Sequence, residues 1–254
     1  MRTTVIKALA ALSLALLLAG FAWAQSQDSI LAKSLPDGSS ILTDGKGMTL
    51  YYFTKDAKGE SSSSGQVAKA WPAFYAPSIS VSPPLKAEDF DSVTRDDGSR
   101  QTTYHGWPLY HWFKDKMPGD MGGEGVGKAW YVLKVPAYTV MIATDPALGN
   151  YLVDGEGNSL YYFAKDSVGA SACNGDCIKN WPAFSVSSLV LPSGLNASDF
   201  GTIVRSDGSI QVTYKGYPLY YWKKDGSRGD VTGQGVGKVW YVVEPEKFMA
   251  AGTM

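Results

Sequence analysis

Two cysteines lie four positions apart. Cys173 and Cys177 enclose Asn-Gly-Asp. We expect them to form a local disulfide, whose loop is so short that it stabilises the fold by only about 2 kcal/mol. A metal or redox role is the alternative, because a Cys-x-x-x-Cys pair can also bind Cu(I). A related segment earlier in the chain has Ser63 and Val67 at these positions, so the bridge is not required for such a segment to fold.

The two histidines share a segment with two methionines. His105 and His111 flank Gly106-Trp107-Pro108, and Met117 and Met121 follow. A turn between the histidines could bring both imidazoles to one copper ion, which also accepts thioether ligands. The simpler interpretation, which we favour, is two surface imidazoles on an aromatic hairpin. A related segment later in the chain has Lys and Tyr instead, so the fold does not need the histidines.

Four aspartates each end an aromatic segment, and a glycine follows each of them within four residues: Asp56, Asp115, Asp166 and Asp225. Such an aspartate can accept hydrogen bonds from the backbone N–H groups of a turn, and we expect these four to be turn caps. The alternative is an oxygen-rich cation site with Asp120 and Asp230 as further ligands. Calcium loops, however, usually carry carboxylates at every second position, and that pattern is absent.

Aromatic residues could form a platform for sugar rings or other flat ligands. The candidates for such a surface are Tyr51, Tyr110, Trp112, Tyr161, Tyr220 and Trp222. The alternative is packing inside the protein, because each aromatic side chain buries a large area. Four other tryptophans, which recur once per repeated segment, are most simply core residues: Trp71, Trp130, Trp181 and Trp240. The sequence contains no nucleophile elbow, zinc-protease motif, phosphate-binding loop or haem attachment motif.

The elements that position these residues are repeated. LYYFTKD at 50–56 returns as LYYFAKD at 160–166, and GVGKAWYV at 125–132 returns as GVGKVWYV at 235–242. Both pairs are 110 residues apart. A weaker repeat with a step of 59 residues relates LYYFTKD to LYHWFKD at 109–115. The chain therefore consists of two copies, each with two modules made of an aromatic strand, an aspartate-headed turn and a later tryptophan.

Each module has the local chemistry of a β-hairpin. Asp97-Gly98 and Asp207-Gly208 separate alternating apolar residues, which is the strongest short-range hairpin signal. Eight Trp, fifteen Tyr and twenty-eight Gly also favour short aromatic strands joined by tight turns. In LYYFAKD the alternation puts Tyr161 and Phe163 on one face of the strand. Only residues 86–90 and 198–201 suggest short helices after the N-terminal leader.

The N-terminus has the features of a signal peptide. Arg2 and Lys7 precede an apolar run, and Ala22-Trp23-Ala24 matches the pattern that signal peptidase cleaves. The run is shorter than the roughly 20 residues of a membrane span, and no later segment is apolar enough. We expect residues 1–24 to be removed, which leaves a soluble periplasmic or secreted protein without a lipid-acceptor cysteine. It would carry 21 basic and 24 acidic residues, which argues against a nucleic-acid partner.

These motifs together resemble one protein family. The aromatic strand that ends in aspartate, the segment from Cys173 to Trp181-Pro182 and the run QVTYKGYPLYYW are similar to a bacterial secreted-repeat family. Its members are described as predicted lipoproteins with a Tyr-x-(Phe/Tyr/Trp)-x-x-Asp motif. The resemblance covers roughly residues 40–133 and 150–243, and it implies an exported protein of tandem repeats with no established activity. The missing lipid-acceptor cysteine departs from the family and favours a soluble protein.

We predict an all-β fold that is a tandem repeat of two copies of about 110 residues, each made of two quasi-equivalent hairpin modules. Copy one spans residues 25–135, and copy two, with the linker, spans residues 136–254. The four modules form either a propeller-like ring or two small β domains. The linker is short and partly apolar, which favours one compact unit.

We expect an exported, non-catalytic binding or accessory protein that presents aromatic hairpins to a small ligand or an exported partner. The alternative is a periplasmic metal-binding or electron-transfer accessory protein that uses the Cys173/Cys177 or the His105/His111 pair, with copper as its metal. An enzyme such as a glycosidase would need two carboxylates that converge in a cleft. The repeated acids are better explained as turn caps.

Overall fold

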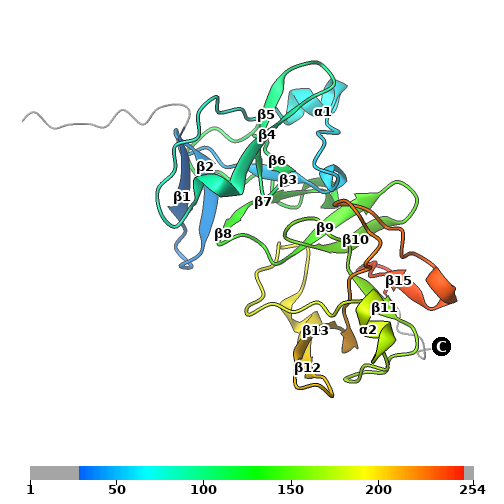
Figure 1. Ribbon diagram of the computed structural model, residues 1–254. Coiled ribbons are helices and arrows are strands. Elements are labelled where there is room, and N and C mark those ends of the chain that lie inside the picture. Colours follow the sequence, from blue (N-terminus) through cyan, green and yellow to red (C-terminus); the bar gives the residue numbers. More distant parts are fainter. Residues whose placement is uncertain (1–28, 249–254) are drawn as a thin grey trace, which may run out of the picture.

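Short antiparallel hairpins make up most of the computed structural model, which describes residues 29–248 (Figure 1). The predicted signal peptide and its cleavage site lie outside these residues. The strands of copy one are β1 (Ile30–Ser34), β2 (Ser40–Asp44), β3 (Tyr51–Phe53), β4 (Phe90–Thr94), β5 (Arg100–Tyr104), β6 (Trp107–Pro108), β7 (Trp130–Val132) and β8 (Lys134–Val135). Those of copy two are β9 (Val140–Asp145), β10 (Gly149–Asp154), β11 (Tyr161–Phe163), β12 (Phe200–Val204), β13 (Ile210–Tyr214), β14 (Tyr217–Pro218) and β15 (Trp240–Val242).

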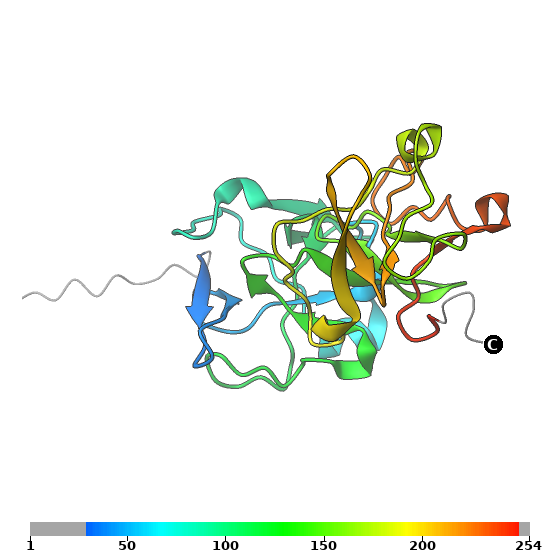
Figure 2. The same cartoon turned by 90° about the horizontal axis from the view of Figure 1, so that it is seen from below.

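Each copy contains three small sheets, which correspond between the copies except that β8 has no counterpart in copy two. In copy one the strand orders are β1-β2-β8, β3-β7 and β4-β5-β6. In copy two they are β10-β9, β11-β15 and β12-β13-β14. The two copies lie side by side in both views, with copy one in blue to green and copy two in green to red (Figure 1, Figure 2). The predicted all-β tandem repeat is confirmed.

The Asp-Gly turns form the predicted hairpins. Residues Thr94 and Arg100 face each other at the end of the β4–β5 ladder, and the turn lies between them. Gly98 in this turn has φ +81°, and its counterpart Gly208 in copy two has φ +82°. Both angles are left-handed, a conformation that glycine adopts at little cost. The Asp97 carboxylate accepts a hydrogen bond from the Ser99 backbone N–H at 2.9 Å, which closes the turn.

Helical structure is limited to short segments. The helical turns predicted near residues 86–90 and 198–201 are confirmed as the 3₁₀ helices η2 (Ala87–Asp89) and η4 (Ala197–Asp199). The other 3₁₀ helices are η1 (Thr54–Asp56), η3 (Val126–Lys128) and η5 (Val236–Lys238). The sequence pattern did not indicate α1 (Gly65–Ala70) and α2 (Asp176–Asn180). Neither helix buries a residue fully, so neither carries the apolar periodicity that would have predicted it.

The two modules of a copy meet through their aromatic segments. The prediction of an aromatic strand in every module is wrong for residues 109–115 and 219–225, where only Tyr110 and Tyr220 form isolated bridges. Tyr51 and Tyr110 exchange both backbone hydrogen bonds, at 2.9 and 3.0 Å, and Tyr161 and Tyr220 do the same at 2.8 and 2.9 Å. The 59-residue repeat therefore places equivalent residues of the two modules opposite each other. The reciprocal pairing joins two hairpin modules into one unit.

Both faces of the aromatic strand β3 are packed against other parts of the protein, as the alternation of its aromatic side chains predicts. Tyr51 and Phe53 belong to an apolar cluster within copy one, together with Trp71 and Trp130. Tyr52, between them, belongs to the larger core that runs through both copies. Such a strand lies between two layers and is buried on both sides. The shared core explains why the copies pack against each other.

Polar contacts join the copies at the edge of this core. Arg228 of copy two donates hydrogen bonds to the backbone carbonyls of Ala57, at 2.7 Å, and His105, at 2.9 Å, in copy one. Its guanidinium lies 5.0 Å from the centroid of the Trp107 ring. The Trp107 indole N–H in turn donates to the Gly155 carbonyl at 3.0 Å. Arg228 therefore links the two copies through hydrogen bonds.

We predict that Arg228→Ala lowers the free energy of unfolding by about 2 kcal/mol, because two part-buried carbonyls lose their donor. Urea unfolding followed by tryptophan fluorescence measures the change. Arg100→Ala removes an exposed arginine on β5 and is the matched control, expected to change stability by less than about 0.5 kcal/mol. Equal effects of the two substitutions would show that Arg228 does not hold the copies together.

Candidate functional site

A stack of four aromatic rings runs through each copy. In copy one the order is Phe53, Trp130, Trp71 and Trp112, with successive ring centroids 4.0, 3.9 and 4.1 Å apart. The corresponding rings of copy two, Phe163, Trp240, Trp181 and Trp222, are 4.2, 3.9 and 4.0 Å apart. The central tryptophans are nearly parallel, with interplanar angles of 2° and 3°. The last ring of each stack is half-buried and reaches the surface.

The stacks follow from the pairing of the strands. Phe53 and Trp130 are partners in the β3–β7 ladder, so their rings lie on the same face. Trp71 comes directly after α1 and packs edge-on against Tyr51, with the ring centroids 5.3 Å apart. Gly123 lies against the same two rings, where a Cβ atom would come within 2.6 Å of Trp71 and 2.9 Å of Tyr51. Stacked and edge-on arrangements are the favoured geometries of aromatic pairs.

The two modules of each copy are joined by reciprocal hydrogen bonds between a tyrosine hydroxyl of one module and an aspartate of the other. The Tyr51 hydroxyl donates to Asp115 at 2.6 Å, and the Tyr110 hydroxyl donates to Asp56 at 2.5 Å. In copy two, Tyr161 donates to Asp225 and Tyr220 to Asp166, both at 2.7 Å. The tyrosine of each aromatic segment thus donates to the aspartate that ends the other segment.

The prediction that these tyrosines form an aromatic surface is wrong. Tyr51, Tyr110, Tyr161 and Tyr220 are completely buried. Their hydroxyl groups tolerate burial because each has a carboxylate acceptor, and burial raises the pKa of all four phenols. Of the predicted surface set, only Trp112 and Trp222 are partly exposed.

The four aspartates also hold the backbone of the loops that follow them. Asp56 accepts from the Ser62 N–H at 2.8 Å and Asp166 from the Ala172 N–H at 2.7 Å. Asp115 and Asp225 accept, each at 3.0 Å, from Gly122 and Thr232. Burial raises the pKa of all four carboxyls, to about 6 for Asp56. The hydrogen bonds from Ser62 and Tyr110 oppose this rise at Asp56.

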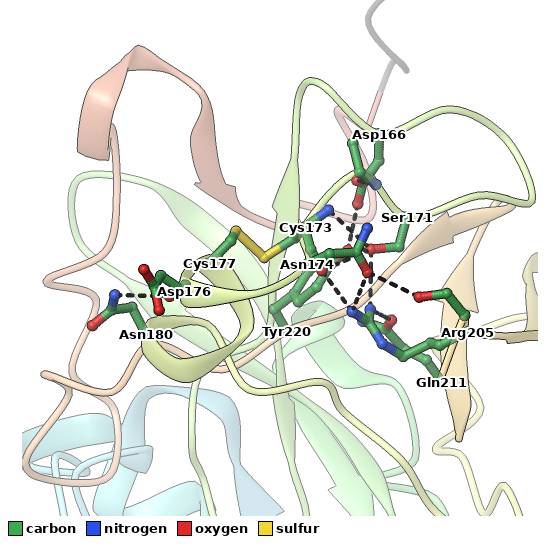
Figure 3. Close-up of a disulfide and its surroundings, with 12 residues drawn as sticks. Asp166, Ser171, Cys173, Asn174, Asp176, Cys177, Asn180, Arg205, Gln211 and Tyr220 are labelled. Atoms are coloured by element: carbon green, nitrogen blue, oxygen red, sulfur yellow. Dashed lines mark hydrogen bonds between the residues drawn. A yellow bond between two sulfur atoms is a disulfide. The ribbon is translucent and has the colours of Figure 1, made fainter. Parts of the chain in front are cut away.

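An arginine and a glutamine that the sequence arguments did not single out support these networks. In copy two, Arg205 donates to the Gln211 carbonyl, to the Cys173 backbone carbonyl and, at 3.0 Å, to Ser171 (Figure 3). Ser171 contacts the Tyr220 hydroxyl at 2.6 Å. Copy one has the same network with Arg95 and Gln101. The signal was available, because Arg95 returns 110 residues later as Arg205.

The predicted disulfide is present. Cys173 and Cys177 are bonded, with their Cα atoms 5.2 Å apart. Cys173 is fully buried beside Arg205, and Cys177 lies half-buried in α2 (Figure 3). The bridge therefore fixes the loop whose Cys173 carbonyl accepts the Arg205 hydrogen bond. The redox interpretation of this pair stays a prediction.

The structure gives the two histidines different partners. His105 Nδ1 lies 2.8 Å from Glu156 Oε1 of copy two, and this hydrogen bond raises the His105 pKa. His111 Nε2 lies 3.1 Å from Asp44 Oδ2 within copy one. Between residues 29 and 248, no three or more His, Cys, Asp or Glu side chains form a group that could hold a metal ion. The copper site with Met117 and Met121 as further ligands stays a prediction.

Apolar side chains are exposed at the outer end of the copy-one stack. Phe113, Met117 and Met121 are 46, 67 and 39% exposed and follow Trp112 in one segment. The Phe113 ring packs edge-on against Trp112, with centroids 4.7 Å apart. We call residues 112–121 the apolar end. In copy two the three exposed positions are occupied by Lys223, Ser227 and Val231.

Two surface cavities lie near the residues of interest. One of about 430 Å³ lies at the junction of the copies and is lined by His105, Glu156 and Arg228 among others. Another of about 290 Å³ lies in copy two beside Trp222 and Lys223. The outer ends of the two stacks thus differ in chemistry, with exposed apolar side chains in copy one and a cavity beside Lys223 in copy two. We take these two ends as the candidate functional sites.

Comparison with known proteins identifies a repeated sequence element. The model of a family described as a secreted repeat of unknown function matches four segments of the chain, at residues 34–74, 91–134, 143–185 and 201–244. Each segment contains one aromatic sequence motif that ends in aspartate and a following tryptophan. No curated protein and no solved structure matches the chain. Within residues 29–248, no helix has both the length and the apolar character to cross a membrane.

We predict that Asp56 makes stability fall as the pH rises. Its pKa of about 6 in the folded protein exceeds the ordinary 3.8, so the folded state binds more protons between these values. Stability is therefore lost as the pH rises through this range, by about 3 kcal/mol. Relative to Asp56→Asn, the natural protein should lose this amount between pH 4 and pH 7 in urea unfolding experiments.

Asp97→Asn is the control for the sign of this effect. Asp97 is exposed, and its hydrogen bonds from Ser99 lower its pKa. The natural protein should therefore gain stability relative to Asp97→Asn as the pH rises. If both variants show the same trend, Asp56 does not hold its proton in the folded state.

We predict that the double substitution Cys173→Ser and Cys177→Val, which installs the residues of copy one, lowers the free energy of unfolding by about 2 kcal/mol. The fold should persist, because copy one forms the same loop without a bridge. Urea unfolding and circular dichroism measure the two quantities. An unfolded double variant would contradict the purely local role of the disulfide.

Proposed function

Because the chain belongs to the family of secreted repeats of unknown function, we propose that it is an exported, non-catalytic binding protein that docks a partner protein in the periplasm or the medium. The docking surface in this proposal is the apolar end of copy one. The observation that carries it is the exposure of Phe113, Met117 and Met121 at the outer end of a rigid aromatic stack.

The apolar end has properties of a protein-binding surface. Three exposed apolar side chains fall within one segment of nine residues, exposed apolar residues commonly mark interaction sites when they lie together, and methionine adapts its shape to different partners. Trp112 is held by stacking on Trp71, so it would lose little conformational freedom on binding. The turn that carries Met117 is also fixed, because its backbone N–H donates to Asp120 at 2.9 Å. The surface is therefore largely formed before a partner arrives.

Lysines border the apolar end and favour an acidic partner. The Lys114 ammonium lies 5.9 Å from the Trp112 ring centroid and 5.6 Å from that of Phe113. Lys116 is exposed on the same segment. A partner with an apolar pocket and an acidic rim would match this arrangement, since complementary charges speed association and set orientation.

The use of the carboxylates supports a non-catalytic role. Each of the four repeated aspartates accepts hydrogen bonds from a tyrosine hydroxyl and from the backbone of a loop. Asp56 is fully buried, and Asp115 and Asp166 are nearly so. Carboxylates held in this way stabilise the fold, whereas a hydrolase needs two that face its substrate.

We predict that the substitutions Phe113→Lys, Met117→Ser and Met121→Val together abolish partner capture. They install the residues of copy two, so the fold should be retained. Immobilised natural and triple-variant proteins would be exposed to the exported proteins of the same cells. A protein captured only by the natural chain would then be purified, and we expect its affinity for the variant to be at least about 100-fold lower. Equal affinities would refute the docking surface.

A further inference from the structure

The cavity beside Trp222 is a second candidate binding site, made of other residues than the apolar end. Its volume is about 290 Å³, and Trp222, Tyr221, Lys223, Asn158 and Asp154 contribute to its walls. We propose that copy two binds an acidic saccharide here, with a pyranose ring against Trp222 and the sugar carboxylate beside Lys223. This proposal goes beyond partner docking and does not depend on it.

The walls of this cavity are already in place. Trp222 stacks on Trp181 with the ring centroids 4.0 Å apart. The Tyr221 hydroxyl donates to Asp154 at 2.9 Å, and Asp154 also accepts from the backbone N–H of Asn158 at 2.9 Å. Ordered walls lower the entropic cost of binding a ligand. A volume just below that of typical drug-sized pockets suits a single sugar unit.

Polar groups at the cavity are free to bind a ligand. Within residues 29–248, no hydrogen-bond partner exists for the indole N–H of Trp222, the ammonium of Lys223 or the side-chain carbonyl of Asn158. A sugar presents hydroxyl groups that donate and accept around a ring whose C–H face is apolar. An aromatic ring bordered by an indole donor, an ammonium and an amide carbonyl can satisfy both kinds of surface.

The distribution of charge favours a sugar that carries a carboxylate. Lys223 lines the cavity and is exposed. The ammonium of the exposed Lys224, which does not line the cavity, lies over the Trp222 ring at 5.6 Å from its centroid, so a sugar on this face moves Lys224 to its edge. Asp154 and Asp225 also line the cavity, but both carboxylates already accept hydrogen bonds from a tyrosine hydroxyl and from backbone N–H groups. A carboxylate would pair with the lysines and keep away from the aspartates, while sugar hydroxyls donate to the aspartate oxygens. This arrangement gives the ring one orientation.

Copy one has other residues at the positions that line the Trp222 cavity in copy two. Met48 replaces Asn158, His111 replaces Tyr221 and Phe113 replaces Lys223. Asn158 and Lys223 are thus exchanged for apolar residues, whereas His111 keeps a hydrogen bond to Asp44 like that of Tyr221 to Asp154, and both copies keep the tryptophan and its stack. Substitutions taken from copy one therefore remove the sugar-binding groups with little risk to the fold.

The test is calorimetric titration of the full mature chain with the trimer of galacturonic acid, and with a neutral galactose trimer. We expect the acidic trimer to bind. Lys223→Phe should weaken binding about threefold and Trp222→Ala about tenfold. Asn158→Met should also weaken binding of the acidic trimer. This variant tests the site independently if Trp222→Ala destabilises copy two. Trp112→Ala, the equivalent change in copy one, should leave binding unchanged.

Three outcomes would overturn the proposal. Absence of binding by the natural chain would refute the site itself. Equal affinity of the natural chain and of the Lys223→Phe and Asn158→Met variants would place the sugar elsewhere. Equal binding of the acidic and neutral trimers would refute the role of the sugar carboxylate. The triple variant of the apolar end should bind the acidic trimer normally, so failure of partner docking and failure of sugar binding are distinguishable.

Discussion

The fold depends on the exchange of tyrosine–aspartate hydrogen bonds between modules. Tyr51 of the first module donates to Asp115 of the second, while Tyr110 of the second donates to Asp56 of the first. A module alone would bury a carboxylate and a phenol with no mutual partner, and unpaired buried polar groups are costly. Two modules satisfy each other, so the modules of one copy depend on each other for partners of their buried polar groups.

The aromatic stacks follow from the same exchange. Once Tyr51 and Tyr110 pair through their backbones, Trp71 and Trp130 are brought face to face at the centre of the copy. Both are nearly fully buried, so their packing leaves little room for change. The outer ends of the stacks are not constrained in this way, and there the copies differ in polarity, with Phe113 in one and Lys223 in the other.

Much of the fold was predictable because its signals are local or periodic. The 110- and 59-residue repeats, the Asp97-Gly98 hairpin and the alternation in β3 each report a short-range rule. The partner of a given aspartate is not such a signal, because Tyr51 lies 64 residues from Asp115. Without that pairing, the tyrosine hydroxyls fit a ligand-binding surface as well as the interior, which is why the sequence alone leaves both interpretations open for the four buried tyrosines. The sequence singles out Trp112, Met117, Met121 and Trp222 but not Phe113, because the exposure of Phe113 and the cavity beside Trp222 arise only from packing.

The duplication leaves the two copies free to specialise. Residues of the internal network are the same in both, as with Arg95 and Arg205, because every member is tied to several others. The copies differ at positions that make few internal hydrogen bonds or that contact the other copy. Arg228, which hydrogen-bonds to copy one, is an example, because its counterpart in copy one is Pro118. A rigid pair with unlike ends can hold two unlike ligands at a fixed separation. The two copies therefore present different side chains above the same aromatic stack, an apolar set around Phe113 and a charged one around Lys223.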